Sequence, residues 1–369
     1  MKRDVSDLSL LVIAGGNSRR MGKDKRFLSL SEGETLLSRI LRKAAGVSFS
    51  HCLLCVAEET PELRHLASHF SFRLVVDRRN GCGPLEGLRA GLAASPTEWV
   101  LAVSADQPFL DFSLAGKLLA AGEAAPEAEA ILPRAGGRKQ PLFALYRKSL
   151  ADCFEQALQE GERKIGAVLH ERNTVVVGEQ AGWPEAVFFN VNTRADLALA
   201  RGRQQNLERR LPIITISAPH SNTGKTTFIE RVLPRLKAAG LRVGIVKGDA
   251  HGYTFDTAGK DSDRFRQAGA DAVAVASPDG YFIEQRTEKR ANLAALAARF
   301  AGIDLVLVES RAHGPSPVIA LCRDDEPFLR EGTAAIFSKP HVDGSGDSAQ
   351  YDLDDIDAAA KVILFLSGK

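Results

Sequence analysis

Two short glycine- and cation-rich loops, each following an apolar run, constrain this chain more than any other feature of its sequence. The first reads Ile-Ala-Gly-Gly-Asn-Ser-Arg-Arg-Met-Gly-Lys-Asp-Lys over Ile13–Lys25. The second reads Ser-Asn-Thr-Gly-Lys-Thr-Thr over Ser221–Thr227 and is typical of a P-loop. Cationic side chains would hold a phosphate chain in the first loop, and backbone N–H groups at a helix N-terminus would hold it in the second. The sequence therefore predicts two nucleotide-binding domains.

The composition of the chain excludes several classes of protein. Its 369 residues are enough for two hydrophobic cores, and 44% hydrophobic with 25% charged residues is ordinary for a globular protein. A net charge of +2 gives no broad positive field, so we expect no nucleic-acid partner. No apolar stretch approaches the about 18 residues of a membrane helix, and the first residues have no signal-peptide core. We therefore expect a cytoplasmic protein with no membrane partner.

The five cysteines are irregularly spaced. Cys52 and Cys55 form a Cys-x-x-Cys pair, but no second pair completes a zinc site. Because the pair lies inside an apolar run, we interpret both members as small buried side chains. Redox or metal chemistry stays as the alternative.

Short apolar runs alternate with helix-length amphipathic stretches, a pattern typical of α/β domains whose mostly parallel sheets are flanked by helices. Strands are predicted over residues 8–14, 52–57, 72–76, 99–104, 130–133, 142–146, 211–217, 242–247, 272–276, 304–309, 318–322 and 334–338. Helices are predicted over residues 35–45, 84–94, 112–121 and 225–239. The polar, basic segment 201–210 is interpreted as a helix end plus linker. We predict one domain over 1–205, a linker over 206–211 and a P-loop domain over 212–369.

The first loop has the residue types that a triphosphate needs. Gly15 and Gly16 follow a predicted strand directly, where a tight turn or a close backbone approach favours glycine. Arg19 and Lys25 follow in the same loop. A nucleoside triphosphate carries about four negative charges, so attack on its α-phosphate requires cations that neutralise them. We therefore predict that these cations clamp a triphosphate; a solvated basic turn is the alternative.

Two aspartates follow predicted strands. Asp106 comes after the strand over 99–104, and the carboxyl ends of parallel strands are where α/β sheets bind ligands and metals. We predict that Asp106 is a Mg²⁺ ligand, because Mg²⁺ favours one or two carboxylates with phosphate oxygens and water. Asp77 is a weaker candidate for holding a base or ribose. A helix cap or turn is the alternative role for each aspartate.

Asn190 and Asn192 alternate on a segment that we expect to be extended. Alternate side chains of an extended segment point the same way, so the two amides could offer paired donors and acceptors to a heterocycle or phosphate. A turn with an asparagine cap is the alternative.

The first half resembles the molybdenum cofactor guanylyltransferase (MobA) family. The motif over Ile13–Lys25, the segment Gly83–Gly87, Asp106 and the segment Phe189–Thr193 carry the resemblance, and Glu86 stands where the family has a small residue. A family asparagine that helps bind GTP is replaced near Glu58. The resemblance implies a Rossmann-like nucleotidyltransferase domain with Lys25, Arg19 and Asp106 as catalytic residues. It implies that Asn190 and Asn192 line the pterin side. The GTP-binding residues that it implies are Ile13, Ala14, Gly15, Gly16, Lys25, Asp77 and Asp106.

The second loop departs from the usual P-loop pattern at one position. Pro219 stands where the first glycine is expected, and proline has no N–H to donate. Lys225 can reach the β- and γ-phosphates, and Thr226 can ligate Mg²⁺. Glu309, at the end of the predicted strand over 304–309, is a second Mg²⁺-side carboxylate, with a solvated acid as the alternative. The predicted GTP-binding residues of this half are Asn222, Thr223, Gly224, Lys225, Thr226 and Thr227.

The second half resembles the molybdopterin-guanine dinucleotide adapter (MobB) family, a family of P-loop GTP-binding proteins. The resemblance rests on residues 256–262, 266–270 and 304–309 and covers residues 211–340, while the tail to Lys369 adds little. Gly248 stands where a histidine often follows Lys247, and Ser310 replaces a glycine. The resemblance implies an adapter that binds GTP, with weak GTPase activity as an option.

Together the two resemblances imply an enzyme that transfers GMP from GTP to molybdopterin, releasing pyrophosphate, with Mg²⁺ as cofactor. GTP, molybdopterin, other molybdenum-cofactor proteins and molybdoenzymes are the expected partners, and a homo-oligomer is left open. Cytidylyl transfer and sugar-phosphate nucleotidyl transfer are the alternative reactions. A non-catalytic cofactor carrier or insertion chaperone is the alternative class.

Overall fold

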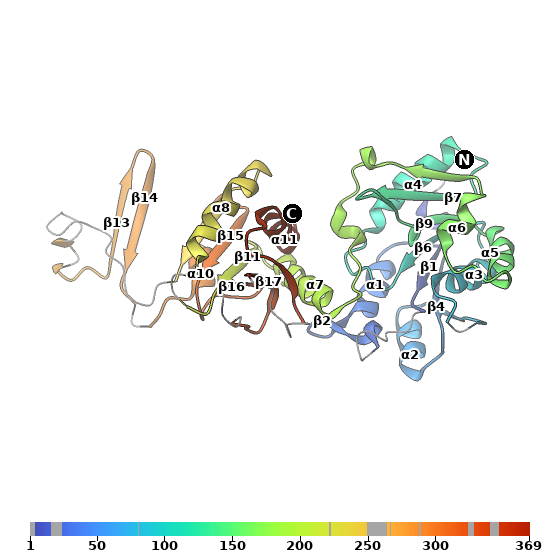
Figure 1. Cartoon of the computed structure of the whole chain (residues 1–369), viewed down its shortest axis with the longest axis horizontal. Helices are drawn as coiled ribbons and strands as arrows, with labels where there is room; N and C mark the ends of the chain where they lie inside the picture. Colours follow the sequence, from blue (N-terminus) through green and yellow to red (C-terminus); the bar gives the residue numbers. More distant parts are fainter. Residues whose placement is uncertain are drawn as a thin grey trace. The chain divides into compact units, whose positions relative to one another are not determined.

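The computed structural model divides into two compact units, Met1–Ala200 and Arg201–Lys369. It describes residues 4–15, 24–79, 81–220, 223–248, 264–265, 267–287, 289–323, 328–339 and 347–369 (Figure 1). Each unit is an α/β domain built on its own sheet, which confirms the predicted fold class. The predicted domain limits at residues 205 and 212 stay a prediction.

The first unit is built on a mixed sheet with the strand order β10-β7-β9-β6-β1-β4-β5. Its strands are β1 (Ser9–Ile13), β4 (His51–Val56), β5 (Arg73–Val76), β6 (Trp99–Ser104), β7 (Ala130–Ala135), β9 (Phe143–Arg147) and β10 (Thr174–Val177), with β8 (Arg138–Lys139) beside β7 and a small ribbon of β2 (Ser29–Ser31) and β3 (Glu34–Thr35). Strands β5, β4, β1 and β6 are parallel, and β9 runs antiparallel between β6 and β7. The carboxyl ends of the four parallel strands therefore share one edge of the sheet.

Helices cover the sheet of the first unit. They are α1 (Leu36–Ala45), α2 (Pro61–His69), α3 (Pro84–Ala94), α4 (Ala115–Ala124), α5 (Leu150–Gln159), α6 (Ile165–His170) and the first part of α7 (Arg194–Leu207). Successive side chains of a strand point to opposite faces of a sheet. Accordingly, Leu10 and Val12 of β1 join one core with residues of α1, α2 and α4, while Leu11 and Ile13 join a second core with residues of α3, α5 and α6. This alternation fixes the register of β1 between two apolar layers.

Two glycines let α3 pack closely on β1. A Cβ at Gly91 would lie 2.3 Å from the two terminal methyl groups of Leu11, and a Cβ at Gly87 would lie 3.0 Å from Cγ2 of Ile13. Leu11 is fully buried, so its methyl groups have little room to move away. The helix therefore approaches the strand through positions that lack a side chain.

The second unit has a parallel sheet with the strand order β12-β15-β11-β16-β17-β18. Its strands are β11 (Ile213–Ser217), β12 (Val243–Lys247), β15 (Leu305–Glu309), β16 (Val318–Arg323), β17 (Thr333–Lys339) and β18 (Ala349–Asp352). Its helices include α8 (Lys225–Ala238), α10 (Leu293–Ala297) and α11 (Ile356–Ser367). None of the helices described in either unit has the length and apolar character that crossing a membrane requires.

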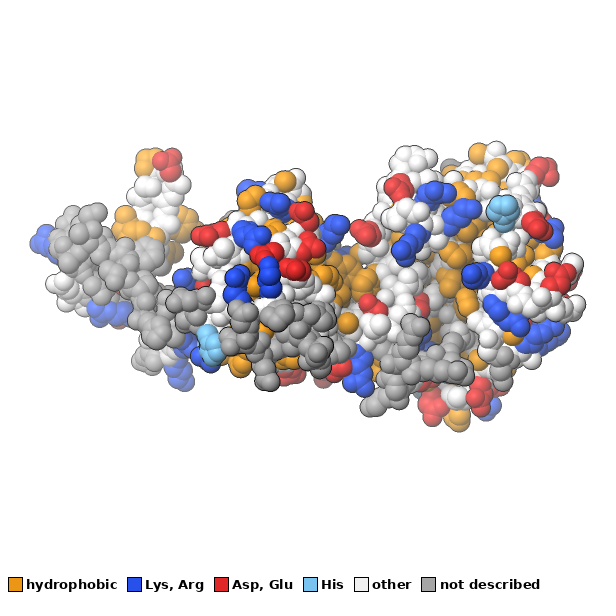
Figure 2. Space-filling view, in the orientation of Figure 1, with side chains coloured by type: hydrophobic (Ala, Val, Ile, Leu, Met, Phe, Trp, Pro, Cys, Tyr) orange, Lys and Arg blue, Asp and Glu red, His pale blue; other side chains and the backbone are white. Residues whose placement is uncertain are grey.

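An antiparallel hairpin of β13 (Ala272–Ser277) and β14 (Gly280–Gln285) forms a two-stranded sheet of its own (Figure 1). Its apolar side chains are exposed, among them Tyr281 and Ile283. Figure 2 shows hydrophobic side chains on this part of the surface.

The C-terminal tail contributes a large part of the second core, although it lies outside the part of the chain that carries the resemblance. Ile363 and Leu366 of α11 are fully buried. The ring of Phe228 in α8 lies 5.4 Å from that of Phe337 in β17, which stacks on Tyr351 of β18 at 4.9 Å. The helix has a strong apolar face, and burying it against the sheet gives the tail its place in the fold.

The polar segment 201–210 is more structured than a helix end plus linker. Helix α7 continues to Leu207, and Asn206 is almost completely buried. The Asn206 Nδ2 donates to the carbonyl of Leu366 at 3.0 Å, and its Oδ1 accepts from the N–H of Ile213 at 3.0 Å. Arg203 donates to the carbonyl of Phe365. Asn206 and Arg203 are thus hydrogen-bonded within the second unit, whereas the buried Oε1 atoms of Gln204 and Gln205 have no hydrogen-bond partner among the described residues.

We expect Gly91→Ala to destabilise the first unit by about 1–3 kcal/mol, because the new methyl group overpacks the core at Leu11. Gly116→Ala is the matched control, since a Cβ there has nothing within 4 Å and alanine favours a helix by up to about 1 kcal/mol. Both tryptophans, Trp99 and Trp183, lie in the first unit, so tryptophan fluorescence during urea unfolding reports on it. Equal midpoints for the two variants would contradict this packing.

Candidate functional site

The first candidate site lies at the shared carboxyl edge of β1, β4, β5 and β6. Ile13 pairs with Ser104 across the β1–β6 ladder, the N–H of Ala105 donates to the carbonyl of Ile13 at 3.0 Å, and that of Ala14 donates to Cys55 at 2.8 Å. A cavity of about 220 Å³ opens there. The residues that line it are Ile13, Ala14, Gly15, Lys25, Arg26, Leu36, Gly83, Pro84, Ser104, Ala105, Asp106 and Leu142. It thus contains Asp106 and four of the residues predicted from the first motif, namely Ile13, Ala14, Gly15 and Lys25.

Lys25 and Asp106 meet in this cavity. The Nζ of Lys25 lies 2.7 Å from Oδ2 of Asp106 and 3.4 Å from Oδ1 of Asn192. The hydroxyl of Ser104 donates to the other carboxylate oxygen of Asp106 at 2.5 Å. The structure thus brings together three predicted residues and adds Ser104. Of the remaining predicted residues, Gly16, Arg19 and Asn222 lie outside the described part of the chain.

The loop that carries Asp106 is held from two other elements. Arg39, a buried residue of α1, donates to the carbonyl of Pro108 at 2.8 Å, and Lys43 of the same helix donates to the carbonyl of Leu110 at 2.7 Å. The N–H of Val191 donates to the carbonyl of Asp106 itself at 2.9 Å. Burial lowers the pKa of Lys43 to about 8. These contacts fix the backbone around the carboxylate, and no motif or spacing in the chain predicts them.

Asn190 and Asn192 have different surroundings. The amide nitrogen of Asn190 donates to the carbonyl of Phe188 at 3.0 Å, whereas the amide oxygen of Asn192 accepts from Lys25. The backbone N–H groups of Asn192 and Thr193 both donate to Asp196, and the hydroxyl of Thr193 accepts from the N–H of Asp196. This reciprocal cap begins α7 and sets the position of Asn192.

Asp77 lies beside the same edge, after β5. A Cβ at Gly15 would come within 2.9 Å of its Oδ2, and a Cβ at Gly87 within 3.8 Å of its Oδ1. Its Oδ1 is buried and has no hydrogen-bond partner among the described residues. Burial, assisted by the charge of Glu86 and opposed by that of Arg89, raises the pKa of Asp77 to about 6. A carboxylate with an unsatisfied buried oxygen beside two glycines is well placed to meet a ligand.

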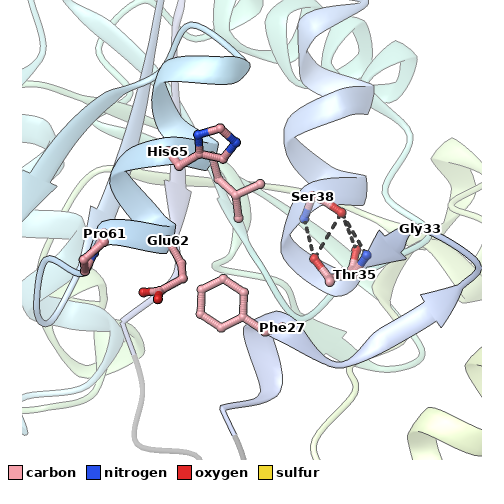
Figure 3. Close-up of a pocket in the computed structure, with 8 residues that line it drawn as sticks. Phe27, Gly33, Thr35, Ser38, Pro61, Glu62 and His65 are labelled. Carbon is pink, nitrogen blue, oxygen red and sulfur yellow. Dashed lines mark hydrogen bonds between the residues drawn. The ribbon is translucent and has the colours of Figure 1, made fainter.

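A second, more open hollow of the first unit lies between η2 (Lys25–Phe27), α1 and α2 (Figure 3). Phe27, Glu62 and His65 line it, together with Thr35 and Ser38, whose side chains cap α1 reciprocally. The sequence singled out none of these residues.

The cysteines of the Cys-x-x-Cys pair point to opposite faces of β4. Cys55 is buried in the core beneath α3, while Cys52 packs against the other core. Burial raises the pKa of Cys52 to about 11 and that of Cys55 well above its usual range. The interpretation as a small buried side chain therefore holds for Cys55, whereas Cys52 is only half-buried.

The P-loop of the second unit lies between β11 and α8. Gly224 caps the helix in the left-handed conformation, with φ of 96°. The hydroxyl of Thr226 lies 3.1 Å from both carboxylate oxygens of Glu309, and the Nζ of Lys225 donates to the carbonyl of His220 at 2.9 Å. Burial lowers the pKa of Lys225, and the charge of Glu309 opposes that shift. The predicted residues Thr226 and Glu309 are thus neighbours.

The other predicted residues of the P-loop have simpler surroundings. The hydroxyl of Thr223 donates to the carbonyl of His220 at 3.0 Å. Thr227 lies exposed in the first turn of α8.

Gly248 and Ser310, the two departures from the adapter pattern, lie together. The N–H of Gly248 donates to the carbonyl of Glu309 at 2.8 Å. A Cβ at Gly248 would lie 3.2 Å from the hydroxyl oxygen of Ser310 and 2.9 Å from Cδ1 of Leu293. The buried Ser310 also accepts from the N–H of His313 at 3.3 Å. A side chain at 248 and a hydroxyl at 310 therefore compete for the same space.

Comparison with known proteins matches each half of the chain to a protein family. Residues 10–175 match the family model described as MobA-like NTP transferase domain, and residues 213–337 match the model described as molybdopterin guanine dinucleotide synthesis protein B. The molybdenum cofactor guanylyltransferase of Burkholderia vietnamiensis is 35% identical over 197 residues, which cover 52% of this chain and 94% of that protein. The probable molybdenum cofactor guanylyltransferase of Peptoclostridium acidaminophilum is 30% identical over 200 residues, covering 51% and 86%.

A solved structure of molybdopterin-guanine biosynthesis protein B (mobB) is 27% identical and covers 42% of this chain and 99% of that chain, with a TM-score of 0.34. The first half and its relatives define a nucleotidyltransferase. The chain belongs to the molybdenum cofactor guanylyltransferase family, and its second half carries a fused MobB domain. The resemblance drawn from the sequence is thereby confirmed.

We expect Gly248→Ala to destabilise the second unit by about 1–3 kcal/mol through overpacking against Ser310 and Leu293. Adding Ser310→Gly should recover part of that loss, giving a coupling of about 0.5–1 kcal/mol between the two positions. The second unit contains no tryptophan, so the change should appear in calorimetric or circular-dichroism melts but leave the tryptophan-fluorescence transition unchanged. Strictly additive effects of the two substitutions would refute the contact.

Proposed function

We propose that this protein transfers GMP from GTP to molybdenum-bound molybdopterin, forming the guanine dinucleotide cofactor and pyrophosphate. The observation that supports the proposal best is the 2.7 Å ion pair of Lys25 with Asp106, two residues 81 positions apart that meet beside Gly15. A cation and a carboxylate at one strand edge, below a glycine-rich motif, suit a metal-bound nucleotide triphosphate. The guanylyltransferase relatives support the choice of nucleotide and acceptor.

In the proposed reaction, a terminal phosphate oxygen of the pterin attacks the α-phosphorus of GTP in line, and the bond to the β-phosphate oxygen breaks. The attacking oxygen is already anionic at neutral pH, so no general base is required. Lys25 neutralises charge that moves onto pyrophosphate, and Arg19 acts with it. Asn190 and Asn192 would contact the pterin, while Asp77 would accept hydrogen bonds from the nucleoside.

The residues at the first site fit Mg²⁺. This ion takes one or two carboxylates, with phosphate oxygens and water completing its shell. Asp106 offers one partly exposed carboxylate, and the described ranges contain no cluster of three or more His, Cys, Asp or Glu side chains of the kind that zinc requires. When bound, Mg²⁺ would supply positive charge to the phosphate oxygens. In the second unit, Thr226 and Glu309 would hold a second Mg²⁺.

The MobB half is proposed to bind GTP as an adapter. Lys225, Gly224 and the first turn of α8 would contact the phosphates. Fusion of the two halves keeps the local concentration of one site high near the other. The finished cofactor would then pass to molybdoenzymes. Weak GTPase activity, assistance by other molybdenum-cofactor proteins and a cytoplasmic location remain predictions.

We expect Lys25→Ala and Asp106→Asn to lower dinucleotide formation by about 100-fold or more, because each removes charge that the transition state needs. The assay incubates pure protein with Mg²⁺, molybdenum-bound molybdopterin and GTP, CTP or ATP, and measures pyrophosphate and product mass. GTP should be the preferred donor. Glu98→Gln, an exposed partner of Arg147, is the control that should retain normal turnover. Normal turnover by Lys25→Ala or Asp106→Asn would contradict the assignment of these residues as catalytic. If the parent protein released no pyrophosphate from any of the three nucleotides, a non-catalytic cofactor carrier would be favoured.

We expect Lys225→Ala to remove one of two GTP-binding events per chain in calorimetric titrations, because it deletes the phosphate-binding cation of the P-loop. Dinucleotide formation at saturating substrate should persist in this variant, since Lys25 and Asp106 are intact. Asp106→Asn should give the reverse pattern, with the P-loop binding event retained. Loss of both events in one variant would argue against two independent sites.

A further inference from the structure

A buried ion-pair network lies directly behind Asp77. Glu86 in the first turn of α3 is fully buried, as is most of Arg89 one turn later. Two guanidinium nitrogens of Arg89 donate to the two carboxylate oxygens of Glu86 at 2.6 and 3.0 Å. The N–H of Arg78 donates to the same carboxylate at 2.9 Å. Glu86 therefore bonds both to its own helix and to the backbone next to Asp77.

A second helix holds the same segment. Arg79 forms a two-point contact with Glu155 of α5 and lies 3.5 Å from Glu86. Arg89 also lies 3.4 Å from Glu155. The segment from Asp77 to Arg79 is thus tied to α3 and α5 through four alternating charges.

Stability alone does not explain the buried glutamate. Burying an ion pair costs desolvation that its attraction often fails to repay, and apolar residues of similar volume frequently do as well. The charge of Glu86 is buried in spite of this desolvation cost and lies beside Asp77, which faces the proposed ligand. This placement suggests that Glu86 acts on the GTP site.

We propose that Glu86 is a positioning residue that fixes the Asp77 segment against the nucleoside and, through its charge, sets the pH range in which Asp77 accepts hydrogen bonds from it. The inference rests on the proposed GTP site of the first unit. It adds Glu86 to the residues that act on the nucleoside, through its contact with the Arg78 N–H and its charge beside Asp77.

The charges around Asp77 support this role. Besides Glu86 and Arg89 of α3, it faces the thiol of Cys55 on β4, with Arg79 and Glu155 beyond. The pKa of Cys55 is raised well above its usual range by burial, so the thiol stays neutral. Hydrogen bonds from Arg89 and the Arg78 N–H outweigh burial and lower the pKa of Glu86, so Glu86 is ionised. The glutamate thus acts as the fixed negative charge next to Asp77.

The sign of the pH effect follows from this arrangement. An ionised carboxylate only accepts hydrogen bonds, and the guanine N–H groups and ribose hydroxyls of a nucleoside can donate to it. With the pKa of Asp77 raised to about 6, affinity for GTP holds above that pH and falls below it. Removing the charge of Glu86 favours ionised Asp77, so the fall should begin at a lower pH.

The test compares Glu86→Gln, Glu86→Ala and the control Glu98→Gln, all in a Lys225→Ala background that leaves one GTP site. GTP dissociation constants are measured by calorimetry from pH 5 to pH 8, with KM and kcat for dinucleotide formation at pH 7.5. The γ-phosphate of GTP also titrates near pH 6. The quantity compared is therefore the affinity midpoint, the pH at which GTP affinity has fallen halfway, and its difference between each variant and the parent.

In Glu86→Gln, which keeps an acceptor for the Arg78 N–H, KM at pH 7.5 should stay within about threefold, while the affinity midpoint moves down by about one pH unit. In Glu86→Ala the midpoint moves likewise, and KM for GTP rises by about tenfold with kcat little changed, because a ground-state contact is misplaced. The Glu98→Gln control should match the parent in both quantities.

An unmoved midpoint in Glu86→Gln, with normal folding and GTP binding, would overturn the inference. A KM for Glu86→Ala equal to the parent's would overturn the positioning part. A protein that binds GTP with the expected shift but makes no dinucleotide would instead refute the proposed function and leave the role of Glu86 intact.

Discussion

The first site depends on the parallel pairing of β1 with β6. Lys25 and Asp106 can meet because Ile13 lies opposite Ser104 at the end of that ladder, which brings the loop after each strand to the same edge. A slip by one residue would turn every side chain of β1 to the wrong core. The two apolar layers that hold Leu10 and Leu11 on opposite faces therefore also keep the loops that carry Lys25 and Asp106 at the same edge of the sheet.

Much of the fold can be predicted from the sequence because buried parallel strands form continuous apolar runs. The strand over Trp99–Ser104 and the helix over Pro84–Ala94 have the predicted bounds. Strands with a weaker signal were missed: β10 is a half-buried edge strand, and β18 is polar. Helix α11 was also missed; it packs on α8 and β11, two elements that lie much earlier in the chain.

The candidate sites were predictable where a glycine-rich motif or a strand end carries a suitable residue type. Lys25 and Asp106 are examples in the first unit, and Thr226 of the P-loop and Glu309 at the end of β15 are examples in the second. The supports of these residues were not predictable, because each joins segments distant in the chain. Arg39 reaches the carbonyl of Pro108, 69 positions away, and neither residue stands out alone. Glu86 and Arg89 are three positions apart on one helix, a pattern more typical of a solvated surface than of a buried network.

The contact between Gly248 and Ser310 has a consequence for how the second half could have diverged from the adapter pattern. Loss of the side chain at 248 first opens space, and the serine hydroxyl can then enter it and bond to the turn at His313. A side chain at 248 would instead place its Cβ 3.2 Å from the serine hydroxyl oxygen, a contact that requires one of the two groups to shift. The two positions are therefore coupled in packing, and the serine hydroxyl suits a position 248 that carries no side chain.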